Sequence, residues 1–252
     1  MEQRVFDILK ILFCTPFLLY ACYSDIKKRR VTNNVWLVML VGSIFSISYE
    51  FSLYKELALR PLIISAGFIF ILACILFKIG AFGGADAKAI MVMSLIIPTY
   101  PVFQTLGYAF PLNKPIYDIF ALSILGNAAL LIAVVPIGLA LYNLAEMGLN
   151  FDNPAYIFMG YKTRISKLAG KHIRLIQGFE MTDGRVRSCF KLGGMEINEK
   201  TIRELKNLSG KCLIKDEVWV TPELPFMIPI TLGFFTAVFY GDLMFELIRF
   251  LL

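Results

Sequence analysis

The sequence predicts a polytopic α-helical membrane protein with about six transmembrane helices and a small α+β soluble domain inserted before the last helix. Three observations support this fold class. The 252 residues are 58% hydrophobic, against roughly 45–50% in ordinary globular chains. Their mean hydropathy is +0.68. Long apolar segments recur along the chain, and one polar stretch with closely spaced charges interrupts them before the last apolar segment.

Charge and cysteine usage exclude several classes of function. The net charge of +6 is typical of a membrane protein with basic cytoplasmic loops. No nucleic-acid-binding motif occurs, so we expect no nucleic-acid partner. No two of the five cysteines form a CxxC pair, and His172 is the single histidine. We therefore expect no zinc site, no histidine-based metal cluster and no histidine-based triad.

The first apolar segment, residues 5–24, is long enough to span a bilayer. A cleaved signal peptide is the alternative, but the apolar core is too long and no A-x-A site precedes Asp25. Four consecutive cations follow at Lys27–Arg30. They place this loop in the cytoplasm, so the N-terminus faces outside and Asp25 lies at the inner membrane surface.

Four further spans follow before the polar stretch. Thr32, Asn33 and Asn34 are typical helix-start residues, and the second span begins after them. The fifth span contains Pro136, a possible kink, and Asn127, which we interpret as an interhelical hydrogen-bonding residue. The expected elements are an outer loop at 50–60 and spans at 62–79, from about 87 to 98–101, and at 119–144.

The polar stretch predicts a small cytoplasmic α+β domain. Residues 172–181 and 185–192 read as strands, and the Asp183-Gly184 pair between them is a strong hairpin signal. Residues 196–209 carry apolar side chains at helical spacing. The predicted domains are therefore a membrane domain at 1–145, which holds spans one to five with Asp25 and Asp86, the soluble domain at 146–223 and a last transmembrane helix at 224–252.

Two prolines, Pro225 and Pro229, lie at the start of the last predicted helix. They indicate either a broken helix start next to a functional site or a plain kink where the chain enters the membrane. The residues alone leave both alternatives open.

Two carboxylates are the leading functional candidates. Asp25 ends the first span and Asp86 begins the fourth, so both lie at the inner surface. Ionised groups at membrane depth are costly and therefore functional by default. Two close carboxylates share one proton, as in aspartic proteases. The ionised member deprotonates the attacking water, and the protonated member polarises the peptide carbonyl. Asp25 and Asp86 are the predicted catalytic residues.

The stretch Gly83-Gly84-Ala85 precedes Asp86 and is the predicted substrate-binding segment. Glycines permit close backbone approach, and an extended substrate could pair with this stretch as an added strand. The structural alternative is a flexible loop in which Asp86 only starts a helix. Lys88 either extends to the membrane surface or pairs with the ionised carboxylate.

The segment Gly83-Gly84-Ala85-Asp86 resembles the GxGD motif of the prepilin and preflagellin peptidases. Gly83, Ala85 and Asp86 occupy the motif positions, and Ala85 replaces the second glycine. Asp25, followed by the basic run and an Asn-containing helix start, is similar to the region around the family's first aspartate. The resemblance covers about residues 10–105.

Within that family the chain looks like the archaeal preflagellin peptidases, because it lacks paired CxxC motifs and carries its polar domain before the last helix. The resemblance implies a membrane aspartyl endopeptidase without a cofactor. Its partners would be the lipid bilayer and a preflagellin or type IV pilin-like precursor. The enzyme would remove the short basic leader of that precursor at the cytoplasmic face.

Two other functions remain as alternatives. Presenilin-type and signal-peptide peptidases share the GxGD motif, but they carry the first aspartate on the preceding helix. A proton-coupled transporter could use Asp25 and Asp86 as a relay. The inner-surface placement of both groups and the lack of inverted repeats disfavour it.

Overall fold

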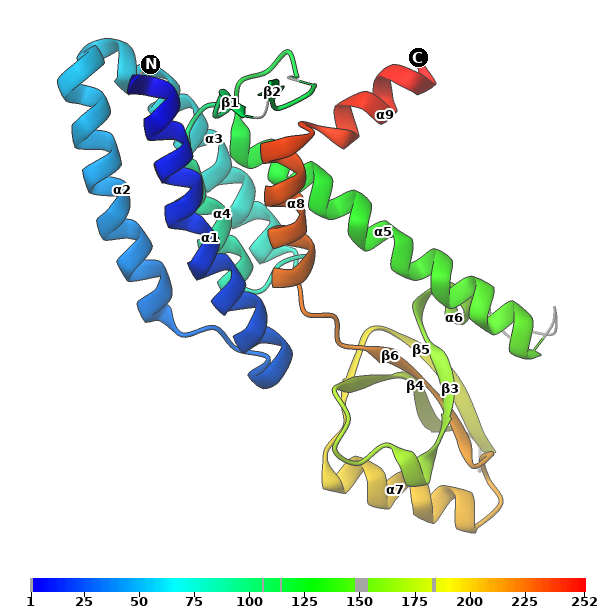
Figure 1. The fold of residues 1–252 in the computed structure, drawn as a ribbon. Coiled ribbons are helices and arrows are strands. Elements are labelled where there is room, and N and C mark those ends of the chain that lie inside the picture. Colours follow the sequence, from blue (N-terminus) through cyan, green and yellow to red (C-terminus); the bar gives the residue numbers. More distant parts are fainter. Residues whose placement is uncertain (1, 106, 114, 148–153, 183–184) are drawn as a thin grey trace. The chain divides into compact units, whose positions relative to one another are not determined.

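The structure is a computed structural model that describes residues 2–105, 107–113, 115–147, 154–182 and 185–252 (Figure 1). The chain divides into two compact units. The first, the helical unit, comprises residues 1–132 and 225–252, and the second, the sheet unit, comprises residues 133–224. The domain boundaries that the sequence suggests, after 145 and after 223, stay predictions.

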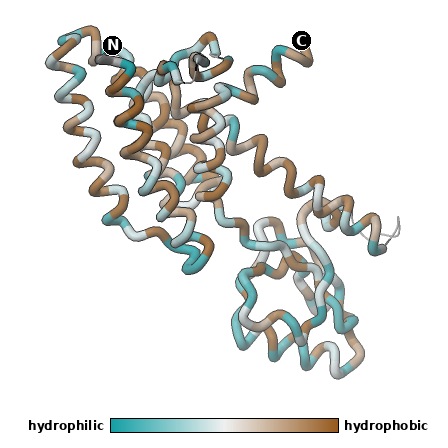
Figure 2. Tube along the Cα trace, in the orientation of Figure 1, coloured by the Kyte–Doolittle hydropathy of each residue, from teal (hydrophilic) through white to brown (hydrophobic). Residues whose placement is uncertain are grey.

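Four helices are long and apolar enough to cross a membrane, counted over the described residues. They are α1 (Glu2–Lys28), α2 (Asn33–Tyr54), α3 (Glu56–Lys78) and α5 (Phe120–Met147). Hydrophobic residues predominate along them, whereas the strands and α7 (Glu199–Gly210) carry more hydrophilic residues (Figure 2). The chain is thus a mostly helical membrane protein with a small sheet-containing unit. Thr32 is the N-cap of α2, as the helix-start residues predict.

Two of the predicted spans form shorter helices. Both α4 (Gly84–Ile96) and α8 (Met227–Phe239) have 13 residues, a rise of about 20 Å at 1.5 Å per residue. A bilayer core is about 30 Å thick. The four long helices therefore do not confirm the predicted six spans.

The prediction of one continuous helix over 224–252 is wrong. The chain breaks after α8 at Gly241, whose φ of 118° is open to glycine alone. Asn113 pairs with Gly241 at this point in an isolated bridge. A new helix, α9 (Leu243–Leu251), then begins, with Asp242 accepting a hydrogen bond from the Phe245 N–H at 2.8 Å.

The predicted outer loop at 50–60 is also wrong. Helix α2 continues to Tyr54 and α3 starts at Glu56, so Lys55 alone separates them, with a φ of 50°. The polar composition of this stretch resembles a loop, but Glu50 belongs to α2, where it pairs with Lys10, and Glu56 and Arg60 lie on exposed turns of α3. The strands β1 (Phe103–Thr105) and β2 (Tyr108–Phe110) were not predicted either. Three residues are too few to show a period of two.

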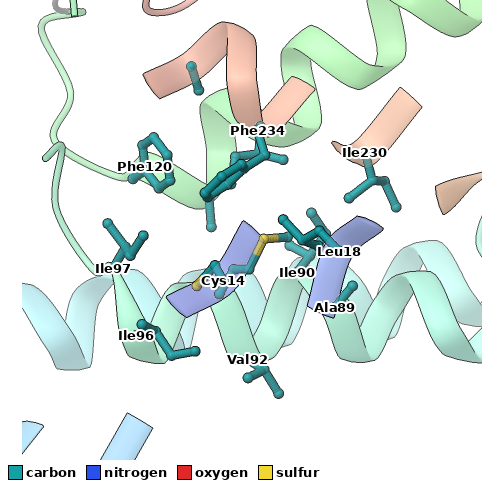
Figure 3. Close-up of a cluster of buried hydrophobic side chains, with 14 of the residues drawn as sticks. Cys14, Leu18, Ala89, Ile90, Val92, Ile96, Ile97, Phe120, Ile230 and Phe234 are labelled. Carbon is teal, nitrogen blue, oxygen red and sulfur yellow. The ribbon is translucent and has the colours of Figure 1, made fainter. Parts of the chain in front are cut away.

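The core of the helical unit lies where α1, α4, α5 and α8 pack together (Figure 3). Gly233 permits close packing of α8 on α5, because a Cβ at this position would lie 2.6 Å from the Ile124 carbonyl oxygen. Asn127 of α5 donates to the Gly241 carbonyl oxygen at 2.9 Å and accepts from the Leu243 N–H at 2.8 Å. The predicted interhelical role of Asn127 is confirmed.

The sheet unit contains one four-stranded antiparallel sheet with the strand order β3-β6-β4-β5. Leu205 of α7 packs with Val218 and Val220 of the sheet in one apolar core. The predicted hairpin is confirmed by the pairing of Thr182 with Arg185, although Asp183 and Gly184 lie outside the described residues. The elements are α6 (Ala155–Met159), β3 (Tyr161–Arg164), a 3₁₀ turn at Ile165–Lys167, β4 (Ile173–Thr182), β5 (Arg185–Glu196), α7 (Glu199–Gly210) and β6 (Glu217–Pro222).

The side chain of Asn143, near the end of α5, binds the backbone of α6 and of the residue that follows it. Its buried side-chain amide donates to the carbonyl oxygens of Ile157 and Gly160 at 2.8 and 2.7 Å. We expect Asn143→Ala to destabilise the sheet unit by about 2 kcal/mol, because two buried carbonyl groups lose a donor. Urea unfolding of the whole protein in a Trp36→Phe background, followed by the fluorescence of Trp219, measures this. Asn207→Ala, at an exposed position, is the control, and equal midpoints for both variants would contradict the prediction.

Candidate active site

Asp86 lies in the first turn of α4. Gly83 is the N-cap residue, and the Asp86 Oδ2 accepts a hydrogen bond from the Gly83 N–H at 3.0 Å. The carboxylate is 5% exposed, and the helix N-terminus favours its negative charge. Asp86 therefore stabilises the start of α4, as the structural alternative predicts. This role alone does not require the carboxylate to be buried.

Asp25 lies in the last turn of α1 and is half-buried. Its Oδ2 accepts a hydrogen bond from the backbone N–H of Met227, the first residue of α8, at 3.2 Å. One turn earlier, the Cys22 Sγ lies 3.1 Å from the Met227 carbonyl oxygen and 3.1 Å from the Thr231 hydroxyl oxygen. The end of α1 is thereby fixed to the start of α8.

The two prolines of the last apolar segment flank this helix start. Helix α8 begins at Met227, between Pro225 and Pro229. Of the two alternatives, the one observed is a helix start beside Asp25.

The fold brings Asp25 and Asp86 to the same end of the helical unit. Asp25 accepts from the first residue of α8, and Asp86 lies in the first turn of α4. The segments before α4 and α8 also meet, since the Phe82 and Phe226 rings pack edge to face with centroids 6.3 Å apart. Each carboxylate accepts from the backbone at the start of a helix, a position suited to anions.

The predicted substrate-binding stretch has a different local structure from the one expected. Gly83 and Gly84 are exposed and Ala85 is half-buried, but α4 already begins at Gly84. The Gly83 carbonyl oxygen accepts from the Ala87 N–H at 3.2 Å. An extended substrate would thus meet a helix N-terminus, not a strand edge. The first N–H groups of a helix have no acceptor within it, so those of Gly84 and Ala85 are the ones available.

Lys88 does not pair with either carboxylate. Its Nζ donates to the Asn33 Oδ1 at 2.7 Å, and its side chain is exposed. The alternative in which Lys88 holds the ionised aspartate is therefore wrong.

Two contributors to the site escaped the sequence reasoning. Met227 and Thr231 lie about 200 positions after Asp25, and no local pattern marks them. Within the described ranges, no group of three or more His, Cys, Asp or Glu residues is arranged to hold a metal ion.

Two family models match the chain. The model of the type IV leader peptidase family matches residues 12–137. The model described as archaeal peptidase A24 C-terminus, type II, matches residues 152–243. Together they cover both the helical segments and the polar stretch.

Curated relatives match nearly the whole chain. The preflagellin peptidase of Methanococcus voltae is 30% identical over 245 residues, which cover 92% of this chain and 94% of the relative. The preflagellin peptidase of Methanocaldococcus jannaschii is 27% identical over 236 residues, covering 89% and 91%. That of Methanococcus maripaludis is 25% identical over 230 residues, covering 89% and 92%.

Proposed function

Because the chain belongs to the type IV leader peptidase family, we propose that it is a membrane aspartyl endopeptidase that uses Asp25 and Asp86. Its substrates are preflagellin or prepilin-like precursors, from which it removes a short basic leader. The observation that carries this proposal is the placement of two carboxylates, from the end of α1 and the start of α4, at one end of the helical unit, where the segments before α4 and α8 pack together.

Among the described residues, each of the two carboxylates uses only one of its oxygens for a hydrogen bond to the backbone. Each aspartate uses its Oδ2 for a backbone N–H, from Gly83 for Asp86 and from Met227 for Asp25. Within the described part of the chain, no further hydrogen bond to either side chain occurs, so each Oδ1 can face water or substrate. Fixed backbone donors hold the two groups without neutralising them.

The chemistry then follows from one shared proton. The ionised aspartate takes a proton from a water molecule, whose oxygen attacks the carbon of the scissile peptide. The protonated aspartate donates a hydrogen bond to the carbonyl oxygen. When the C–N bond breaks, a proton passes from the dyad to the leaving nitrogen. The N-termini of α4 and α8 stabilise the negative charge that remains on the pair.

Charge distribution supports a cytoplasmic site. The helix ends around the two aspartates carry a basic run and two further lysines, a distribution typical of the inner membrane face. In this topology the part of the sheet unit that follows α5 is cytoplasmic and six segments cross the bilayer, so α4 and α8 cross together with their flanking segments. The cations are Lys27, Lys28, Arg29, Arg30, Lys78 and Lys88.

A cleavage assay tests the function. The protein is placed in membranes with a precursor that carries a basic leader before an apolar segment. We expect a shorter product on a gel, with one new N-terminus found by mass spectrometry. Failure to cut any basic-leader precursor, with proton-coupled uptake in vesicles, would support the transporter alternative instead.

Gly83 sets the position of the Asp86 carboxylate. A Cβ at Gly83 would lie 3.0 Å from the Asp86 Oδ2, whereas one at Gly84 would lie 3.9 Å from its nearest neighbour, Phe77. We expect Gly83→Ala to lower the cleavage rate by about tenfold to a hundredfold, since misplaced catalytic groups cost rate steeply. Gly84→Ala should have a smaller effect. An equal loss for the two variants would show that Gly83 does not act through Asp86.

A further inference from the structure

A groove lies between α2, α3 and α4, separate from the two aspartates. Its volume is about 500 Å³, and apolar side chains form most of its walls, among them Leu40, Phe70 and Leu95. Leu37 and Phe70 are more than half exposed. An apolar hollow on the outer surface of a membrane helix bundle contacts the acyl chains of lipids. These chains carry no polar groups that would need hydrogen-bond partners in the hollow.

The groove faces away from the catalytic aspartates. The α4 residues that line it include Lys88, Met91 and Leu95. At 3.6 residues per turn they point roughly 140–200° away from Asp86 around the helix. The opposite face of α4, with Ala89, Ile90 and Met93, is buried in the core. A precursor whose peptide bond lies at Asp86 would have to pass around α4 to place its apolar segment in the groove.

The polar groups of the groove are gathered at one end. Asn33 is the first residue of α2 and Lys88 follows the first turn of α4, and their side chains bind each other at 2.7 Å. Ser94 also lines the groove, but its hydroxyl donates to the Met91 carbonyl oxygen. The remaining polar group is the indole Nε1 of Trp36, which is buried and has no hydrogen-bond partner among the described residues.

This arrangement matches an amphiphile with a negative head. One cation, Lys88, and the side-chain amide of Asn33 stand at the entrance of an apolar hollow about 10 Å long, counted from Lys88 to Leu95 at 1.5 Å per residue. The same membrane face carries the basic run and Lys78, which attract anionic headgroups. The basic leader of a precursor would instead be repelled by Lys88.

We propose that the groove between α2, α3 and α4 binds one acyl chain of an anionic phospholipid, with the lipid phosphate held by Lys88 and Asn33. The site is independent of the proteolytic chemistry. A lipid bound in the groove would pack against the face of α4 that is opposite Asp86.

Trp36 provides the probe for a direct test. The chain has two tryptophans, so Trp219→Phe leaves Trp36 as the single fluorophore. This protein is reconstituted in phosphatidylcholine vesicles that contain rising fractions of phosphatidylglycerol brominated on its acyl chains, or of equally brominated phosphatidylcholine. We expect half-maximal quenching at an about fivefold lower mole fraction of the anionic lipid, the preference that one lysine near the surface supplies.

Matched variants separate this site from the general lipid shell. Lys88→Gln should abolish the preference, whereas Lys78→Gln removes a cation from the same helix ends without touching the groove and should keep it. Ala66→Phe fills the groove and should reduce the quenching by both lipids. Equal quenching by the two lipids in the Trp219→Phe protein, or an unchanged preference in Lys88→Gln, would overturn the proposal. Relief of quenching by added precursor would assign the groove to the substrate and overturn it as well.

Discussion

Asp86→Asn and Asp25→Asn should each lower leader cleavage by about a thousandfold or more, because neither variant can pass a proton between water and the peptide. Asparagine keeps the side-chain oxygen that accepts from the Gly83 N–H in one case and the Met227 N–H in the other. We therefore expect both variants to fold, so that the loss reports chemistry. Initial rates in membranes, at equal amounts of protein, measure it.

The control makes the same chemical change away from the site. Asp216→Asn alters an exposed carboxylate in the sheet unit and should cleave at the parental rate. The double variant of Asp25 and Asp86 should be no slower than either single variant, since groups that act as one unit are not additive. If one folded single variant retained cleavage within about tenfold of the parent, that aspartate would be structural and the dyad would be refuted.

Gly241→Ala should produce the largest loss of stability in the helical unit. An added Cβ would overlap the Asn113 carbonyl oxygen, and the φ of 118° lies outside the range of L-residues. The break between α8 and α9 would have to shift, together with the hydrogen bond that Asn127 donates to Gly241 and the one that it accepts from Leu243. We expect a destabilisation of about 3 kcal/mol, read as a lower Tm of the detergent-solubilised protein.

Gly67→Ala is the matched control for that substitution. Gly67 lies within α3, and a Cβ there has no neighbour within 4 Å among the described residues. Alanine is favoured over glycine in a helix by about 1 kcal/mol, so this variant should be as stable as the parent or slightly more stable. Similar Tm values for the two variants would show that the break at Gly241 tolerates a side chain.

The sequence by itself determined the membrane character, the helices and the sheet-containing unit, because these depend on local patterns. Long apolar runs specify α1, α2, α3 and α5. The Asp-Gly pair and the helical spacing of apolar residues specified the β4–β5 hairpin and α7. Carboxylates at the ends of apolar segments singled out Asp25 and Asp86, since the cost of a charge beside hydrocarbon can be read from composition alone.

The tertiary structure decided what depends on contacts between distant segments. The break at Gly241 exists because Asn113 pairs with it and Asn127 binds both sides of it. Residues 50–60 are helical except for Lys55, which separates α2 from α3. Asp25 accepts a hydrogen bond from the backbone at the start of α8, and Lys88 donates to Asn33 and not to Asp86. Each of these outcomes depends on which side chain or backbone group lies opposite in space. The packing of the complete chain determines those neighbours. Sequence periodicity indicates only which face of a single segment is apolar.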